Sequence, residues 1–266
     1  MHSRVTPAAI VCSLLLATIT LGGQAPAYRA PRTADGKPDL NGIWEAVNTA
    51  YWDLEAHGAD SGPVVVLGAA FAKPPGQSVV DVETIPYLPA ALTKKKENQA
   101  NWMKLDPEVK CLLPGVPRSN YLPYPFQIVQ GSRSMAIVYE YDNFVRPINM
   151  GAPTKSPGDS WMGWSNGRWE GETLVVDVTS QNDKTWFDRA GNFHSDALHV
   201  VERYTPRSAD TLTYEATIED PKVFSRPWKI SMPLYRRADK NMKLLEFRCV
   251  QFTEELLYGQ FRKKAD

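Results

Sequence analysis

Residues 161–204 read WMGWSNGRWEGETLVVDVTSQNDKTWFDRAGNFHSDALHVVERY and hold two strand patterns on either side of a loop. In the first pattern, 164–169 and 173–179 pair as a hairpin across Glu170-Gly171. The loop that follows carries Trp186, Asp188, Arg189, His194 and Asp196. Because loops on a rigid sheet often carry binding and catalytic groups, the segment predicts a β-protein with an aromatic, polar-edged site.

Strand patterns also surround this segment and follow one another closely. We predict strands at 126–130, 135–141, 164–169, 173–179, 198–205, 211–219, 228–236 and 243–251. In 135–141 the apolar side chains alternate with a period of two, as in a half-buried strand. Strands without helices between them predict an antiparallel meander, and closure into a barrel removes its free edges. We therefore expect an all-β, lipocalin-like barrel, with 126–251 as the main meander of a single domain over 28–266.

The region 47–125 is rich in proline, which excludes long central strands. We predict an irregular arm or lid there, with one helix at 90–105 and a short helical turn at Asp106-Pro107-Glu108. Before it, Gly42-Ile43-Trp44 is typical of the first strand of a lipocalin-like barrel, where the Trp plugs the closed end. An ordinary core Trp explains these three residues equally well.

The amino-terminal residues 1–27 have the pattern of an export signal. A short positive start precedes an apolar run at 8–21, and Ala25-Pro26-Ala27 supplies the small residues of a cleavage site. The run is short for a membrane span, and a retained anchor is the alternative. We expect a periplasmic or extracellular protein without a stable membrane anchor after processing. Cys111 and Cys249 then remain, and an oxidising compartment permits one disulfide between them.

Composition and spacing argue against several classes of function. The 30 Lys and Arg residues balance 30 Asp and Glu residues, so no basic surface for nucleic acid is expected. His199 and Glu202 lie on opposite faces of a strand and do not chelate one ion, and no H-E-x-x-H spacing exists, so we expect no metal. Phosphate loops and dinucleotide fingerprints are also missing, so we expect no cofactor. Ser165 lies in a G-x-S-x-G match, but a hairpin follows it instead of the helix of a nucleophile elbow.

His and carboxylate groups in two loops suggest acid–base chemistry. His194 is a candidate general base with Asp188 as the carboxylate that orients it. Asp53 and His57, in the run Y-W-D-L-E-A-H at 51–57, are candidates for a second proton-transfer group. The alternative is a loop His that only bonds its neighbours.

The same loops offer aromatic walls for a small molecule if they converge on one barrel mouth. The candidate ligand-binding residues are Trp52, Tyr121, Tyr124, Arg146, Trp161, Trp164, Asp177, Asn182 and Trp186. If Asp177 faces inward it must be paired or protonated, and Arg146, Arg168 and Arg203 are candidate partners. Our leading hypothesis is a barrel that binds a small apolar or aromatic molecule. The alternatives are a cofactor-independent lyase, isomerase or hydrolase with His194 as base, and a structural envelope protein.

Four motifs together resemble a large, mostly uncharacterised family of secreted bacterial proteins. They are D-L-N-G-I-W at 39–44, C-L-L-P-G-V-P-R at 111–118, P-F-Q-I-V-Q at 125–130 and R-W-E-G-E-T-L-V-V-D at 168–177. The resemblance covers nearly all of the expected mature chain. In the family pattern a His commonly stands at the place of Trp164, and a Cys-His-Glu-x-Asn run stands where this chain reads Cys249-Val250-Gln251-Phe252. The resemblance thus implies that any metal or base role of those histidines is lost here. It favours a Trp-lined apolar site, and it implies that a retained function lies in the matching loop with Asn182, Trp186, Asp188 and His194.

Overall fold

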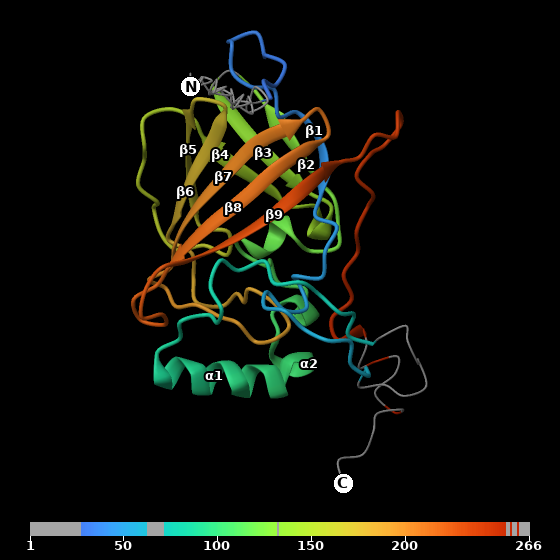
Figure 1. The fold of residues 1–266 in the computed structure, drawn as a ribbon, viewed down its shortest axis with the longest axis vertical. Helices are drawn as coiled ribbons and strands as arrows, with labels where there is room; N and C mark the ends of the chain where they lie inside the picture. The colour runs from blue at the N-terminus through green and yellow to red at the C-terminus, as the bar shows by residue number, and fades with distance from the viewer. Residues whose placement is uncertain (1–27, 63–71, 132, 254–255, 257–259, 261–266) are drawn as a thin grey trace, which may run out of the picture.

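Nine strands close into a barrel in the computed structural model, which describes all residues except 1–27, 63–71, 132, 254–255, 257–259 and 261–266 (Figure 1). In chain order the strands are β1 (Gly42–Glu45), β2 (Phe126–Gln130), β3 (Ser134–Tyr139), β4 (Val145–Asn149), β5 (Trp164–Glu170), β6 (Thr173–Thr179), β7 (His199–Ser208), β8 (Thr211–Glu219) and β9 (Trp228–Arg236). The expected all-β barrel is therefore confirmed. The expected export signal lies outside the described residues. Among the described residues, no helix has the length and apolar character to cross a membrane.

One predicted strand is wrong and one strand escaped prediction. Residues 243–250 run as irregular backbone beside the barrel, although their side chains alternate. A strand there would need a free edge, but β9 pairs with β1 and closes the sheet. The unpredicted strand is β4, whose sequence contains Pro147. Pro147 is paired with Ala136 of β3, although proline removes a donor from the ladder.

The antiparallel meander is also broken at one place. β4 and β5 are parallel, with Asn149 opposite Asn166, whereas the other neighbouring strands are antiparallel. Two parallel strands cannot be joined by a tight turn, so residues 150–163 form a long crossover along the outside of the barrel, beside β5 in Figure 1. This crossover lines one side of a cleft of about 750 Å³.

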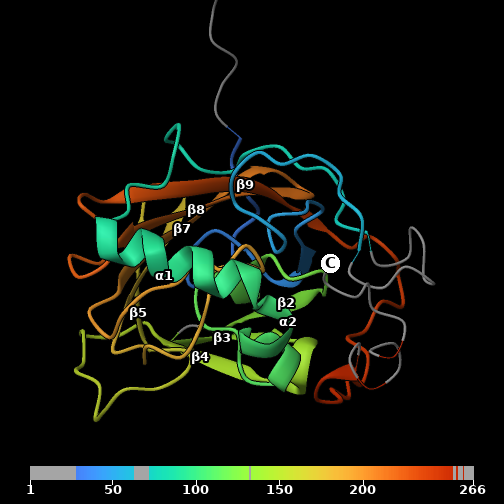
Figure 2. The same ribbon diagram turned by 90° about the horizontal axis from the view of Figure 1, so that it is seen from below.

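The arm between β1 and β2 covers one end of the barrel. Its helices α1 (Pro89–Ala100) and α2 (Trp102–Leu105) lie across that end, as Figure 2 shows from below. Proline at the first helical position suits the start of α1. Gly191 allows the barrel loops to approach α1 closely, since its φ is +82° and a Cβ there would lie 2.7 Å from Lys95 O.

The arm then enters the barrel through two short 3-10 helices, η2 (Glu108–Lys110) and η3 (Arg118–Asn120). A third 3-10 helix, η4 (Tyr141–Asn143), follows β3. Arg118 anchors this path because its guanidinium is fully buried and bonds Asp106 through two donors, at 2.7 and 2.8 Å. Glu108 adds bonds to both Arg118 and Arg189. These ion pairs hold η3 so that Ser119 and Asn120 are buried inside the barrel.

A disulfide joins Cys111 in the arm to Cys249 in the carboxyl-terminal segment, at a sequence separation of 138 and with 5.6 Å between their Cα atoms. The segment is also held by Phe247, which packs on Tyr124 and Tyr141. Thus the residues predicted as a last strand are fixed to the arm instead.

We predict that the double variant Cys111→Ser/Cys249→Ser loses about 2–4 kcal/mol of unfolding free energy, because the long loop is no longer closed in the unfolded chain. Urea titrations of oxidised wild type and variant measure this difference. Wild type kept in reductant is the control, and its unfolding midpoint should match that of the variant. Equal midpoints for oxidised wild type and variant would contradict the prediction.

Candidate ligand-binding site

A cleft of about 750 Å³ opens at the junction of β4 and β5. Few backbone hydrogen bonds join these strands, and side-chain amides hold them instead. Asn149 Nδ2 donates to Asn166 Oδ1 at 3.0 Å, and Asn166 also exchanges hydrogen bonds with the backbone of Thr154 in the crossover. The amides thus fasten the crossover over the junction while the rest of the two strands diverges.

Most of the cleft lining is apolar and aromatic. The lining residues that matter here are Leu113, Met135, Phe144, Ile148, Trp161, Met162 and Trp164. Trp161 and Trp164 come from the end of the crossover and the start of β5, and Trp164 Nε1 donates to Thr154 Oγ1 at 3.0 Å. Arg133 and Asp159, of opposite charge, also belong to the lining. The cleft therefore offers two indole walls and no strong net charge.

Arg146 and Ser165 form the polar part of the lining on the barrel side, where both are buried. Arg146 Nε donates to Ser165 Oγ at 2.9 Å, and its two terminal nitrogens donate to Glu202. Burial opposes the charge of Arg146, but Glu202 holds its pKa well above the ordinary value. The guanidinium charge is thus compensated from within the protein.

Glu202 lies on the inner face of β7 and is fully buried. Besides Arg146, its Oε1 accepts hydrogen bonds from Asn120 at 2.7 Å, Tyr204 at 3.0 Å and Tyr214 at 2.8 Å. Burial, followed by the charge of Glu202, raises the pKa of both tyrosines well above their ordinary value, so they stay protonated as donors. A saturated network of this kind is rigid, because each member fixes its neighbours.

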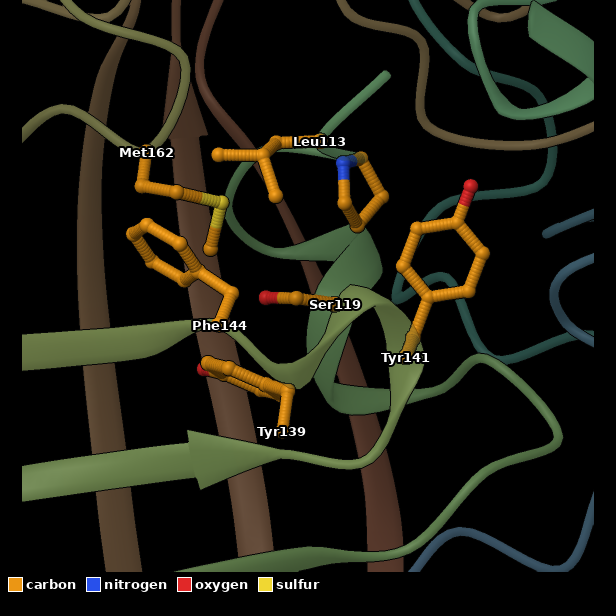
Figure 3. Close-up of a pocket in the computed structure, with 7 residues that line it drawn as sticks. Leu113, Ser119, Tyr139, Tyr141, Phe144 and Met162 are labelled. Atoms are coloured by element: carbon orange, nitrogen blue, oxygen red, sulfur yellow. The ribbon is translucent and has the colours of Figure 1, made fainter. Parts of the chain in front are cut away.

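A small inner chamber of about 10 Å³ adjoins the cleft. Leu113, Phe144 and Met162 line both spaces, and Pro114, Ser119, Tyr139 and Tyr141 complete the chamber (Figure 3). In Figure 3 the Ser119 hydroxyl points toward Phe144 and Met162. The chamber therefore lies between the cleft and η3.

The loop that the sequence singled out is filled with internal hydrogen bonds. His194 is buried, and its Nδ1 lies 2.8 Å from the Ser195 carbonyl oxygen, so Nδ1 carries the proton. Its Nε2 then accepts from Thr185 Oγ1 at 2.6 Å and lies 3.3 Å from Gln181 Nε2. Burial lowers the pKa of His194 and keeps the ring neutral. Both ring nitrogens bond neighbours other than Asp188, so the expected orientation of His194 by Asp188 is not what the structure shows.

Asp188 instead joins the two loops that the sequence grouped together. It is fully buried and accepts from the Leu54 backbone at 2.9 Å and from both nitrogens of Asn192. Burial, and then the charge of nearby Asp53, raise the pKa of Asp188 to about 7. Asp53 itself is paired with Lys73 at 3.1 Å. The loops 51–57 and 182–196 do converge, but they pack against each other.

The remaining aromatic candidates pack within the arm or within the loop 182–196. Trp52 meets Trp102 edge to face, and the Arg189 guanidinium lies 4.7 Å from the Trp52 ring. Trp186 is nearly buried and is bridged to Phe193. His57 Nδ1 lies 2.8 Å from the Glu55 carbonyl oxygen. The structure thus separates these residues from the cleft that holds Trp161 and Trp164.

The other candidates are also spread over the molecule. Tyr121 is fully buried and donates to the Phe187 carbonyl oxygen at 2.9 Å, whereas Tyr124 packs on the disulfide-linked segment. Asn182 pairs through its backbone with Ser160, near the cleft. Asp177 faces outward on β6, where it bonds His199 Nε2 at 3.0 Å and none of the expected arginines. The condition for an inward ion pair of Asp177 is therefore not met.

Sequence reasoning missed Glu202 and the residues around it. Glu202 shares the inner face of β7 with Val200 and Tyr204, and a carboxylate between buried side chains requires a partner. That pattern alone predicts a buried ion pair, and Arg146 is its partner. Ser119 gave no comparable pattern, because its place depends on how the arm enters the barrel.

No protein-family model, no curated protein and no solved structure matches this chain. The family suggested by the sequence motifs therefore stays a prediction.

Proposed function

We propose that this protein binds a small, largely apolar or aromatic molecule in the cleft between β4 and β5. The observation that carries the proposal is the cleft itself, whose volume of about 750 Å³ falls in the range of small-molecule sites. Trp161 and Trp164 supply flat walls, and three of the residues expected to bind a ligand, these two and Arg146, line it together.

The electrostatics favour an uncharged ligand. Glu202 compensates the charge of Arg146, and a ligand carboxylate on the barrel side would have to lose its water without gaining a free cation. Arg146 and Ser165 then form a fixed polar surface on the barrel side of the cleft, which orients the bound molecule. His194 has no accessible ring nitrogen in this arrangement, so the geometry supports binding more than acid–base catalysis.

Fluorescence titration with N-phenyl-1-naphthylamine, an uncharged aromatic probe, tests the proposal. We predict saturable binding to wild type and roughly tenfold weaker binding to Trp164→Ala, because an aromatic wall and its buried area are lost. Trp102→Ala is the matched control, since Trp102 packs with Trp52 in the arm, and its affinity should stay within about twofold. Absence of saturable binding to wild type, or equal losses in both variants, refutes the site.

We further propose that the chain is exported. The pattern of residues 1–27 and the Cys111–Cys249 disulfide both suit an oxidising compartment. Fractionation of expressing bacteria with mass measurement tests this: the expected product is a periplasmic chain that lacks about 27 residues. A full-length product in the cytoplasm would disprove export.

A further inference from the structure

We propose that the ligand carries a neutral oxygen, a hydroxyl or a carbonyl, which enters the inner chamber and bonds Ser119. This inference rests on the proposed binding function and names the chemical class of the ligand. It depends on three features: an unpartnered hydroxyl, a chamber of one-atom size, and side chains shared with the cleft.

The first feature is the Ser119 hydroxyl. Ser119 is 4% exposed, and its Oγ makes no hydrogen bond of good geometry among the described residues. It lies near the Tyr139 hydroxyl, but that hydroxyl donates its own proton to Asn120 Oδ1 at 2.9 Å. Buried polar groups in folded proteins are nearly always bonded, so an exception indicates a group that serves another purpose. Its neighbours in η3 differ, because Asn120 bonds Glu202 and Arg118 bonds Asp106. Ser119 is thus held rigidly on both sides while its own hydroxyl remains available.

The second feature is the size and position of the chamber. A volume of about 10 Å³ accommodates one water-sized group and excludes a ring. Because Leu113, Phe144 and Met162 line both chamber and cleft, a ring in the cleft can direct one substituent toward Ser119 past these side chains (Figure 3). Met162 has a flexible, unbranched side chain that adapts to such a passage.

The third feature is the absence of a spare charge at this place among the described lining residues. The polar residues of its lining, Ser119, Tyr139 and Tyr141, carry hydroxyls and no ionised group. The Tyr139 hydroxyl donates to Asn120 and the Tyr141 hydroxyl to the Glu108 carbonyl oxygen, so only the Ser119 hydroxyl is available to a ligand. A serine hydroxyl both donates and accepts, so it bonds a carbonyl or a hydroxyl oxygen equally well. An ionised group would be buried without a counter-charge, which costs far more. The chamber therefore selects neutral oxygen substituents.

The test compares four compounds of one shape as competitors of N-phenyl-1-naphthylamine: indane, 5-indanol, 1-indanone and indane-5-carboxylate. For wild type we expect at least one of the two neutral oxygen compounds to bind roughly tenfold more tightly than indane, and the carboxylate to gain nothing. In Ser119→Ala the preference should vanish while indane affinity stays the same. The melting temperature should change little, because the Ser119 hydroxyl makes no internal hydrogen bond of good geometry.

Ser160→Ala is the matched control. Ser160 also lines the cleft, but its hydroxyl bonds the Gly163 carbonyl, so the oxygen preference should persist in this variant. If wild type binds the probe and indane but shows no oxygen preference, the inference fails and the proposed function stands. A preference that survives in Ser119→Ala likewise overturns the inference. If the probe does not bind wild type, the proposed function fails and the inference fails with it.

Discussion

Replacing Glu202 with Gln lowers the free energy of unfolding by about 3–5 kcal/mol, because Arg146 is then left as an uncompensated buried charge. The two guanidinium donors now meet Glu202 at both carboxylate oxygens. In Glu202→Gln the Oε1 can still accept from Tyr204 and Tyr214. The amide nitrogen then faces Arg146, and because both groups are hydrogen-bond donors they cannot bond each other. Urea unfolding with the disulfide intact measures the loss as a shift of the midpoint at constant slope.

Two comparisons isolate the charge effect. The double variant Arg146→Met/Glu202→Gln removes the stranded charge and should recover at least about 1–2 kcal/mol of the loss. Glu170→Gln breaks the exposed bonds to Arg168 and Arg203, and should leave the midpoint almost unchanged. A Glu202→Gln midpoint as high as that of Glu170→Gln would show that the inner network does not stabilise the barrel.

Asp188 should make the stability of the protein fall as the pH rises from about 4 to about 7. Its folded pKa, about 7, lies above the ordinary value of 3.8, so in this window the folded state holds a proton that the unfolded chain has released. The stabilising contribution is complete below pH 4 and is lost as the pH rises through 7. A shift of about three pKa units corresponds to roughly 4 kcal/mol.

The difference in unfolding free energy between wild type and Asp188→Asn measures this effect, because other titrating groups cancel. We expect this difference to fall by about 4 kcal/mol between pH 4 and pH 8 and to be flat at higher pH. Asp196→Asn is the control, because a hydrogen bond from Lys222 lowers the pKa of the exposed Asp196 carboxyl below 3.8, so the difference for this variant should stay flat between pH 4 and pH 8. Parallel pH profiles for wild type and Asp188→Asn would refute the prediction.

The strands were predictable where the local pattern is sufficient. The hairpin of β5 and β6 follows from alternation on either side of Glu170-Gly171, and the structure has the same pairing. Pro147 concealed β4, because a proline argues against a strand in any local reading. The predicted strand 243–251 failed for a non-local reason, since its pattern suits a sheet but β1 already occupies the free edge of β9.

The candidate site was predictable only in part. Arg146, Trp161 and Trp164 were grouped correctly by residue type, but they were placed at one barrel mouth with Trp52 and Trp186. The structure puts the first three at the side of the barrel, under the crossover 150–163. A parallel junction depends on contacts between distant segments, and no local periodicity encodes it. The same limit hid Ser119, whose position follows from ion pairs of Arg118 with Asp106 and Glu108.

The parallel junction of β4 and β5 also bears on where the barrel wall opens in local fluctuations. The strands from β5 through β9 and β1 to β4 form one antiparallel sheet. The barrel closes where β4 meets β5, and the side chains of Asn149 and Asn166 are hydrogen-bonded at this junction. Local opening concentrates where the fewest backbone hydrogen bonds must break. We therefore expect the barrel wall to open locally at the β4–β5 junction, where one residue pair is in register, at a lower free-energy cost than global unfolding.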